Sequence, residues 1–380
     1  MGAIGSIKRF VRRETADSTP CIHGGRTAES GCEGVLDFSA NLNPMGIPEV
    51  DTSTKIAERI EEEIQHYPDN RYLRLREAFA DFAERYSSCP ECTKKITAEN
   101  IIPANGSSEL IRLFAETVVR RGDHVIIPAP TFDEYAFQCQ LFGTTVQYCD
   151  YSQILELTST EISDASALFL CNPNNPTGDL ISRKEVMELV NRCCDHETFL
   201  FVDEAFIELA DPAQSITHAV LNSEFVFVLR SLTKVFAVPG LRIGFGIASR
   251  ELAELLNRVR LVWNIGAPAE ITGMHLMGSC MKSDYLDRSI ELIKKEREYL
   301  MKGLIDRGLK PMKSDANFIL INITNTEMNS HELTQELLGH GILVRDCASF
   351  KNLGTGYVRV AVRTREENRM LLQAVDAVVR

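Results

Sequence analysis

The feature that most constrains the fold of this chain is a repeated alternation of short apolar runs with longer amphipathic segments. This alternation indicates βαβ units, because two neighbouring parallel strands need a crossover segment, usually a helix, between them. The expected strands cover residues 124–128, 145–149, 167–171, 199–203, 225–231 and 242–248. The sequence therefore predicts an α/β fold with a mostly parallel sheet flanked by helices.

The helical patterns suggest how the chain divides into domains. One helix is expected to begin near Ser107, and a second long helical pattern covers about residues 268–307. Residues 317–323 and 356–362 are predicted strands, and residues 366–379 a closing helix. A chain of 380 residues suits one large and one small domain. We expect a large domain at 51–275 and a small α+β domain at 276–380, completed by an N-terminal segment at 1–50.

Composition and charge exclude several classes of partner. The formal net charge of -12 disfavours general binding to nucleic acids or anionic membranes, because the phosphates would be repelled. The sequence contains no uninterrupted apolar stretch of about 18 residues, so no transmembrane helix is predicted. Residues 1–13 carry four basic side chains but lack the apolar core of a signal peptide. A cytoplasmic protein with no nucleic-acid or membrane partner is expected.

The eleven cysteines form no framework pattern and are odd in number, so reduced thiols are expected rather than disulfides. The string Cys-Pro-Glu-Cys at residues 89–92 has a spacing that suits one half of a tetrahedral metal site. A second half is not evident, since Cys21 and Cys32 lie eleven residues apart. We therefore predict no metal, and treat Cys89 and Cys92 as structural or incidental.

The string most specific for chemistry covers residues 231–244 and reads Ser-Leu-Thr-Lys-Val-Phe-Ala-Val-Pro-Gly-Leu-Arg-Ile-Gly. Its lysine, Lys234, follows an apolar strand and is flanked by Ser231, Thr233 and Arg242, which can all hydrogen-bond a phosphate. Neighbouring positive charge would lower the pKa of the amine toward a nucleophilic form. A lone lysine in a loop would more simply be solvated, but this string is long and specific.

Three further strings end expected strands or begin helices. Asp203 ends a predicted strand, and ligands bind at the carboxyl ends of parallel strands. Glu204 is a competing acid at the same place. A simpler role for Asp203 would be to cap a helix or a turn. The loop at residues 171–178, Cys-Asn-Pro-Asn-Asn-Pro-Thr-Gly, also follows a strand. Gly106, Ser107 and Ser108 open a helix whose free N–H groups suit an anion, unless a serine simply caps it.

Taken together, these strings resemble the class I and II aminotransferases, which are pyridoxal-5′-phosphate (PLP) enzymes of fold type I. The resemblance implies that Lys234 holds PLP as a Schiff base and that Asp203 keeps the pyridine nitrogen protonated. It also implies that Asn175 donates to the ring hydroxyl. An aromatic side chain, Phe132 or otherwise Tyr135, is expected to stack on the ring.

The same resemblance supplies the remaining site residues. It implies a phosphate site made of Gly106, Ser107, Ser108, Ser231, Thr233 and Arg242. Tyr67, in the string His-Tyr-Pro-Asp at 66–69, matches a tyrosine that reaches the cofactor phosphate of a neighbouring subunit, so a homodimer is implied. Arg359 matches the arginine that clamps the substrate α-carboxylate.

Within the family, the chain resembles the branch that holds histidinol-phosphate aminotransferase and L-threonine-O-3-phosphate decarboxylase. In this branch the arginine at position 345 binds substrate phosphate. The strings at 23–25 and 36–44 look like the opening of the decarboxylase, which places His23, Ser39 and Asn41 near that phosphate. Phe206 stands where the aminotransferases carry a tyrosine that contacts the ring hydroxyl.

These features favour decarboxylation of L-threonine O-3-phosphate to (R)-1-amino-2-propanol O-2-phosphate, a step of cobalamin biosynthesis. The alternative is transamination of histidinol phosphate in histidine biosynthesis. A third reading is a regulatory protein without enzymatic activity, since such proteins share this fold. The retained Lys234 and the lack of a basic patch argue against that third reading.

Overall fold

The computed structural model describes residues 8–22, 24–25, 34–49, 53–87, 89 and 92–379. Its largest element is a seven-stranded sheet, in which only β8 runs antiparallel to its neighbours. In spatial order the strands are β2 (Ile101–Ala104), β8 (Gly244–Ala248), β7 (Val226–Ser231), β6 (Phe199–Asp203), β5 (Ala167–Cys171), β3 (His124–Ala129) and β4 (Thr145–Asp150). The predicted α/β fold with a mostly parallel sheet is confirmed. Within this sheet, β2 is the strand that was not predicted.

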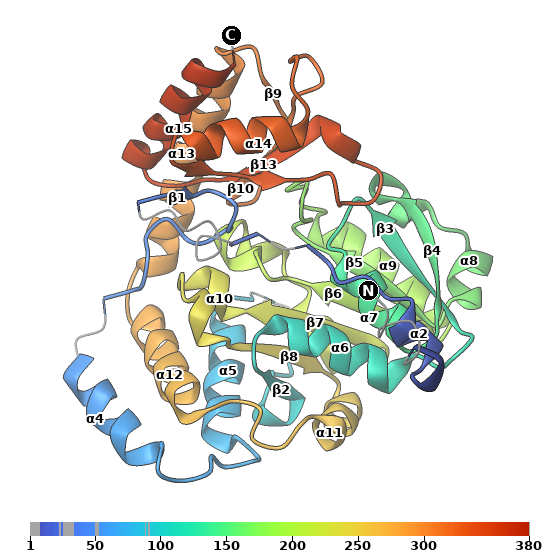
Figure 1. Cartoon of the computed structure of the whole chain (residues 1–380). Helices are drawn as coiled ribbons and strands as arrows, with labels where there is room; N and C mark the ends of the chain where they lie inside the picture. Colours follow the sequence, from blue (N-terminus) through green and yellow to red (C-terminus); the bar gives the residue numbers. More distant parts are fainter. Residues whose placement is uncertain are drawn as a thin grey trace.

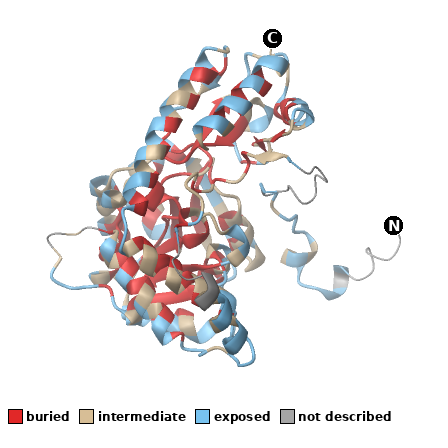
Figure 2. Cartoon of the chain, turned by 90° about the vertical axis from the view of Figure 1, so that its left-hand side faces the viewer, coloured by how far each residue is buried: buried red, intermediate tan, exposed pale blue. Residues whose placement is uncertain are grey.

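Helices cover both faces of this sheet (Figure 1). One face packs against α6 (Ser107–Val118), α7 (Glu134–Leu141) and α11 (Arg250–Val259). The other face packs against α5 (Leu73–Arg85), α9 (Arg183–Asp195) and α12 (Ala267–Met281). Figure 2 shows buried residues gathered along the strands and on the inner sides of these helices. Burying apolar surface on both sides of the sheet is the main force that holds this layered structure together.

Alternation along the central strands decides which side chains face which layer. Phe201 and Phe227 belong to the core under α6 and α7, while Val202 and Val228 belong to the core under α5 and α9. Continued to the ends of both strands, this alternation points Asp203 and Ser231 toward the α6 and α7 side. Their neighbours Glu204 and Arg230 point to the opposite side.

A second, antiparallel sheet is built from the C-terminal part of the chain. Its order is β12 (Arg345–Asp346), β13 (Tyr357–Ala361), β10 (Phe318–Asn322) and β9 (Lys310–Pro311). Leucines and valines of α13 (Tyr285–Ile305), α14 (Ser330–Gly339) and α15 (Arg365–Val378) cover one of its faces. The N-terminal strand β1 (Leu36–Asp37) pairs with β11 (Ile342–Leu343), so the N-terminal segment joins the C-terminal part of the chain here.

The long helical pattern at 268–307 is two helices, so the prediction of one continuous helix was wrong. Helix α12 ends at Met281 and α13 begins at Tyr285. The hydroxyl of Ser283 donates to the carbonyl of Cys280 and accepts from the N–H of Tyr285, which satisfies backbone groups in the break. The three residues between the helices change the direction of the chain.

The remaining elements are short or peripheral. Helix α4 (Ser53–Glu63) packs beside α12, and α2 (Arg13–Ala16) lies against α7. The others are α8 (Ser159–Asp164), α10 (Leu232–Val235), η1 (Lys8–Phe10), η2 (Ala98–Asn100), η3 (Tyr151–Glu156), η4 (Ile207–Leu209), η5 (Pro212–Gln214), η6 (Thr217–Leu221), η7 (Pro239–Leu241) and η8 (Gly354–Gly356). No helix in the described part of the chain has the length and apolar content needed to span a bilayer.

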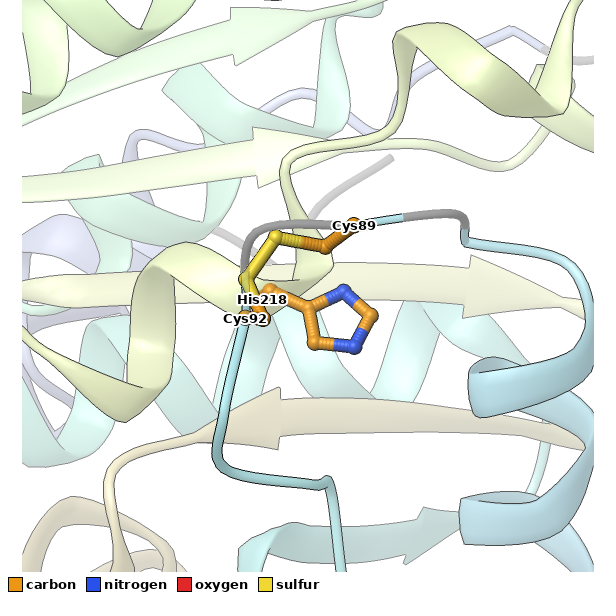
Figure 3. Close-up of side chains that lie close together, drawn as sticks. All are labelled: Cys89, Cys92 and His218. Atoms are coloured by element: carbon orange, nitrogen blue, oxygen red, sulfur yellow. A yellow bond between two sulfur atoms is a disulfide. The ribbon is translucent and has the colours of Figure 1, made fainter.

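The expectation that every cysteine is a free thiol was wrong for one pair. Cys89 and Cys92 form a disulfide, with Cα atoms 5.3 Å apart (Figure 3). The physical reason is local: a spacer of two residues brings the side chains within the separation that a disulfide requires. Eight further cysteines in the described ranges are free thiols.

Candidate active site

The residues predicted from separate motifs meet around one cavity of about 220 Å³. It lies where the carboxyl ends of β5 and β6 face the second sheet. The predicted residues that line it are Ser39, Asn41, Ser107, Ser108, Phe132, Asn175, Asp203, Phe206, Thr233, Lys234, Arg242, Arg345 and Arg359. Tyr135, Cys171, Ile22, Gly24 and Phe350 also line it. The cavity therefore joins residues that are more than 300 positions apart in the sequence.

Lys234 lies in the single turn of α10, directly after β7. Its side chain lines the cavity at the carboxyl end of that strand. Burial, together with the nearby guanidinium groups of Arg359 and Arg242, lowers the pKa of its amine to about 8. A lower pKa leaves a larger neutral fraction at physiological pH, as a nucleophilic amine requires.

Asp203 ends β6 and is buried on the cavity side of the sheet. One carboxylate oxygen accepts a hydrogen bond from the hydroxyl of Tyr135 at 2.7 Å, and the other accepts from the N–H of Ala205 at 2.9 Å. Burial raises the pKa of Asp203 to about 6, although these two donors favour its ionised form. A cationic partner in the cavity would stabilise the carboxylate further.

Glu204, the competing acid, faces away from the cavity. Its carboxylate accepts from the hydroxyl of Ser215 at 2.6 Å and from the N–H of Ile216 at 2.7 Å, and it lies 3.4 Å from Arg230. The alternation along β6 explains this separation, because neighbouring strand residues point to opposite faces. Of the two acids, Asp203 is the one available to a ligand.

The start of α6 forms a site for an anion. Gly106 is the N-cap residue at φ 78°, and no side chain caps the helix, so the simple serine cap is excluded. Ser107 Oγ donates to Ser231 Oγ at 3.4 Å, and Ser231 shares a hydrogen bond of 3.0 Å with Thr233. A Cβ atom at Gly106 would lie 2.4 Å from a guanidinium nitrogen of Arg242.

Glycine therefore lets the Arg242 guanidinium approach the end of the helix. Free N–H groups, three hydroxyls and one guanidinium converge there, a combination that suits phosphate. Gly106 and Ser231 do not line the cavity themselves. They lie behind the lining residues and hold them in position.

The loop after β5 brings Asn175 to the cavity. Asn174 fixes this loop, because its amide donates to the carbonyl of Pro130 and to the hydroxyl of Thr177, both at 2.9 Å. Asn175 Oδ1 accepts a hydrogen bond from Arg359 Nη1. Phe132 lines the cavity and packs edge-on against Tyr135, with ring centroids 5.7 Å apart.

Two arginines of the second sheet face the same cavity. Arg345 of β12 stands directly opposite Arg359 of β13 in the antiparallel ladder. Arg359 Nη2 donates to the carbonyl of Ser39 at 2.9 Å, and Arg345 Nη2 donates to the carbonyl of Ile22 at 2.6 Å. Burial lowers the pKa of Arg359 to about 10, and the positive charge of Arg345 acts in the same direction. The pair is suited to an anionic ligand.

The N-terminal segment closes the cavity from the side of these arginines. Ser39 Oγ accepts from the N–H of Gly25 at 2.8 Å and donates to a carboxylate oxygen of Asp37 at 2.6 Å. Asn41 is buried, and its Oδ1 has no hydrogen-bond partner in the described part of the chain. A buried acceptor of this kind is suited to a ligand that brings a donor. His23 lies outside the described residues.

Tyr67 is the one described site residue that lies away from its own cavity. Its side chain is 78% exposed and stacks on Trp263, with ring centroids 4.2 Å apart. This position is compatible with a role toward a second subunit, which stays a prediction.

From the sequence, Tyr135 was predicted only as the alternative ring for stacking, so its contact with Asp203 was missed. The tyrosine is fully buried and supports Asp203 by a hydrogen bond. Its spacing of three residues from Phe132, across the start of α7, was the available signal. Gly24 belongs to the string at 23–25 that was singled out, whereas Ile22 and Phe350 carried no signal, because apolar residues gain such a role only through packing.

The cavity fits PLP as the resemblance implied. Asp203 offers a buried carboxylate for the pyridine nitrogen, and Lys234 offers an amine of lowered pKa for covalent attachment. The start of α6 with Ser107, Thr233 and Arg242 offers a phosphate site. The donor set matches each polar part of the cofactor.

Comparison with known proteins agrees with this geometry. Residues 33–375 match the family "Aminotransferase class I and II". The chain is 32% identical to the histidinol-phosphate aminotransferase of Methanopyrus kandleri, over 91% of this chain and 88% of the relative. It is 33% identical to a protein of Caldanaerobacter subterraneus subsp. tengcongensis that is provisionally named threonine-phosphate decarboxylase, over 96% of this chain and 95% of the relative.

Among solved structures, the histidinol-phosphate aminotransferase of Sinorhizobium meliloti in complex with PLP superimposes with a TM-score of 0.80. It is 19% identical and covers 95% of this chain and 96% of its own, so it supports the fold. The family match spans nearly the whole chain and includes the lysine, aspartate and asparagine motifs. The chain belongs to the class I and II aminotransferase family of PLP-dependent enzymes.

Proposed function

We propose that this enzyme decarboxylates L-threonine O-3-phosphate to (R)-1-amino-2-propanol O-2-phosphate. The observation that carries the proposal is the pair Arg345 and Arg359, which stand opposite each other on neighbouring strands and line the cavity together with Lys234. Directly opposed residues of an antiparallel pair have Cβ atoms about 4.5–5.5 Å apart. Two guanidinium groups so close together suit a short substrate with two anionic groups.

Threonine phosphate carries both of these groups, a carboxylate on Cα and a phosphate on Cβ. We assign the carboxylate to Arg359, whose planar guanidinium is already oriented by Asn175 and by the carbonyl of Ser39. We assign the phosphate to Arg345, with Ser39 and Asn41 lining the same cavity. Histidinol phosphate has a phosphate but no carboxylate, so it would leave one arginine without its anion.

Lys234 performs the proton transfers in this proposal. Bound PLP supplies an electron sink that stabilises negative charge at the substrate Cα. The amine of Lys234, with its pKa near neutrality, can release a proton to Cα after CO₂ has left. Asp203, held by Tyr135 and Ala205, keeps the acceptor ring nitrogen protonated.

The orientation of the carboxylate decides between the two reactions. With PLP bound, the residues that hold the substrate would decide which bond at Cα breaks. Arg359 is fixed by two hydrogen bonds to the protein, so it can hold the carboxylate in one orientation. Phe206 places an apolar ring at the cavity and packs on Phe318 with centroids 5.0 Å apart. It offers no hydroxyl to the cofactor.

We also propose a homodimer in which Tyr67 of each subunit reaches the cofactor phosphate of the other. The exposed ring of Tyr67 and its stacking on Trp263 support this arrangement, since an aromatic pair on the surface is typical of an interface.

The second candidate is transamination of histidinol phosphate. The identity of 32% to the Methanopyrus kandleri aminotransferase, over 91% of this chain, favours it. In that reaction Arg359 and Arg345 would bind the two carboxylates of the amino donor.

The two candidates are separated by the product that each substrate yields. The purified holoenzyme is incubated with L-threonine O-3-phosphate and assayed for CO₂, and in parallel with histidinol phosphate and 2-oxoglutarate and assayed for glutamate. We expect CO₂ release without glutamate formation. Glutamate formation without CO₂ would overturn the decarboxylase proposal and leave the PLP fold in place.

A further inference from the structure

A cluster of metal-binding side chains lies outside the cavity. Cys89, Cys92 and His218 each offer one ligand atom, and these three atoms lie within 4.8 Å of one another. The two cysteines follow α5 and stand three positions apart in the sequence, whereas His218 comes from η6, more than 120 residues later (Figure 3). His218 thus offers the cluster a third ligand atom, which the sequence did not reveal. None of the three residues lines the active-site cavity.

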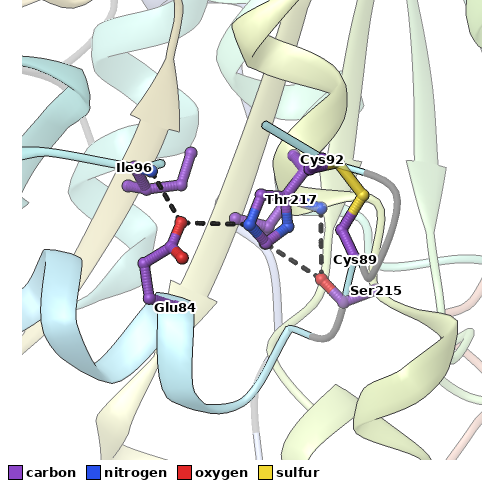
Figure 4. The surroundings of a disulfide bond; sticks show 7 residues. Glu84, Cys89, Cys92, Ile96, Ser215 and Thr217 are labelled. Atoms are coloured by element: carbon purple, nitrogen blue, oxygen red, sulfur yellow. Dashed lines mark hydrogen bonds and ion pairs between the residues drawn. A yellow bond between two sulfur atoms is a disulfide. The ribbon is translucent and has the colours of Figure 1, made fainter. Parts of the chain in front are cut away.

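The imidazole of His218 is held in the orientation that metal-binding histidines show. Its Nε2 lies 3.0 Å from Glu84 Oε1, and that carboxylate oxygen also accepts from the N–H of Ile96 at 2.6 Å (Figure 4). The bond to Glu84 leaves Nδ1 as the ring nitrogen that can bind a metal. A carboxylate on the second nitrogen of a histidine fixes its tautomer and raises its basicity toward a metal.

The two segments that carry the ligands are tied to one buried cation. Arg230 Nη1 donates to Ser87 Oγ at 2.9 Å and to Thr217 Oγ1 at 3.0 Å. Ser87 stands two residues before Cys89, and Thr217 stands directly before His218. Arg230 is itself fully buried and paired with Glu208 at 2.7 Å. The distance between the ligand-bearing segments is therefore fixed by the core.

We propose that Cys89, Cys92 and His218 form a redox-gated binding site for a thiophilic divalent cation, with Zn²⁺ as the best-fitting ion. Zinc binds thiolate sulfur at about 2.3 Å and imidazole nitrogen at about 2.0–2.1 Å in a tetrahedral arrangement. Neighbouring ligand atoms in such a site are roughly 3.3–3.8 Å apart, so the two sulfur atoms, which are bonded to each other here, have to separate by side-chain rotation once the disulfide is reduced. A water molecule can take the fourth position, since both cysteines are only partly buried.

In the oxidised protein the disulfide prevents metal binding at this site. A dithiol reductant donates two electrons and two protons, the S–S bond breaks, two cysteine thiols form, and the reductant becomes a disulfide. Binding of Zn²⁺ then releases the two thiol protons and forms two metal–sulfur bonds. Oxidation removes both sulfur ligands at once, because each sulfur is then bonded to the other.

The test uses the holoenzyme, reduced with a phosphine and stripped of metal, and then titrated with Zn²⁺ against a chromophoric chelator. We expect one equivalent to bind to the reduced protein and none at this site in the oxidised protein. Cys89→Ser and His218→Ala should each lose this equivalent. Glu84→Gln should retain it with an affinity about 10–100-fold weaker, as is typical when a supporting carboxylate is removed.

Cys194→Ser is the matched control, because Cys194 is a partly exposed free thiol outside the cluster. It should bind Zn²⁺ like the unaltered protein. The visible absorption of bound PLP and the thermal midpoint show that each variant is folded. A folded, reduced protein that binds no Zn²⁺, or a Cys89→Ser variant that binds as tightly as the control, would overturn the proposal. No substrate is used, so the result is independent of the proposed reaction.

Discussion

The two halves of the active site are built in different ways. The cofactor half consists of Lys234, Asp203, Asn175 and the start of α6, all on the large sheet or on loops that leave it. The substrate half consists of Arg345, Arg359 and the segment around Ser39, which meet through β12, β13 and the N-terminal strand. The first half is a set of local motifs, and the second exists only after distant segments have paired.

This difference has a chemical meaning. The cofactor half supplies groups for an invariant molecule, so its geometry can be fixed by short strings with strict spacing. In the proposed reaction, the substrate half decides which amino compound reacts and which bond at Cα breaks. Its arginines are positioned by carbonyl groups of Ile22 and Ser39, which come from the N-terminal segment. Changes in that segment can alter specificity without disturbing the cofactor.

The largest expected effect comes from breaking the cofactor half with Lys234→Ala. Loss of a proton-transfer group alone costs about 10²–10⁴-fold in rate, and here the covalent link is lost as well, so no turnover should be detected. The measurement is kcat together with the visible absorption of the attached cofactor. Lys282→Ala, which alters an exposed lysine, is the control. Retention of the absorption after dialysis would contradict the assignment of Lys234.

The substrate half is tested by Arg359→Lys and Arg345→Lys, which keep the positive charge but lose the planar guanidinium group with its paired N–H donors. A hydrogen bond to a charged group contributes about 1.5–3 kcal/mol, so each variant should lose roughly 10–100-fold in kcat/KM. Comparing threonine phosphate with threonine separates the two roles. Arg345→Lys should reduce the preference for the phosphorylated substrate, whereas Arg359→Lys should weaken both substrates alike. The reverse pattern would exchange the two assignments.

Tyr135→Phe tests the hydrogen bond by which Tyr135 supports Asp203. The hydroxyl of Tyr135 favours the ionised form of Asp203, so its removal should raise the pKa of that carboxyl above its present value of about 6. The carboxylate exists above its pKa, so the acidic limb of the kcat profile should move to higher pH. We expect kcat near neutrality to fall about tenfold, the scale of one charged hydrogen bond. The control is Tyr86→Phe, which removes a hydroxyl that donates to the carbonyl of Cys280, and it should leave the profile unchanged.

The smallest effect is a shift in the pH at which the apoenzyme captures PLP. Only the neutral amine reacts, so the rate should rise with pH through the lowered pKa of Lys234, about 8, rather than through 10.5. Arg359→Leu removes a positive neighbour and should move this midpoint upward, which couples the substrate half to the cofactor half. Arg258→Leu, on the surface, is the control. A midpoint that is the same in both variants would show that the halves are electrostatically independent.

Prediction from sequence succeeded where the signal is contiguous. Strands β5 and β6 were predicted to the residue, because continuous apolar runs are bounded by turn residues. It failed for β2, a run of four residues that contains Pro103, and for the break between α12 and α13, where no proline or glycine marks the turn. It also failed for the Cys89–Cys92 disulfide, since a spacing of this kind suits either a metal or a bond.

By itself the sequence determined the fold class, the family resemblance and the residues of the cofactor half, because each depends on spacing within a few dozen residues. The tertiary structure decided that Asp203 and not Glu204 faces the cavity, that Tyr135 supports it, and that Arg345 and Arg359 stand opposite each other on neighbouring strands. These facts depend on which face of a strand a residue occupies and on which strands pair. Both are set by the packing of the whole chain, since strand pairing brings together residues that no local pattern connects.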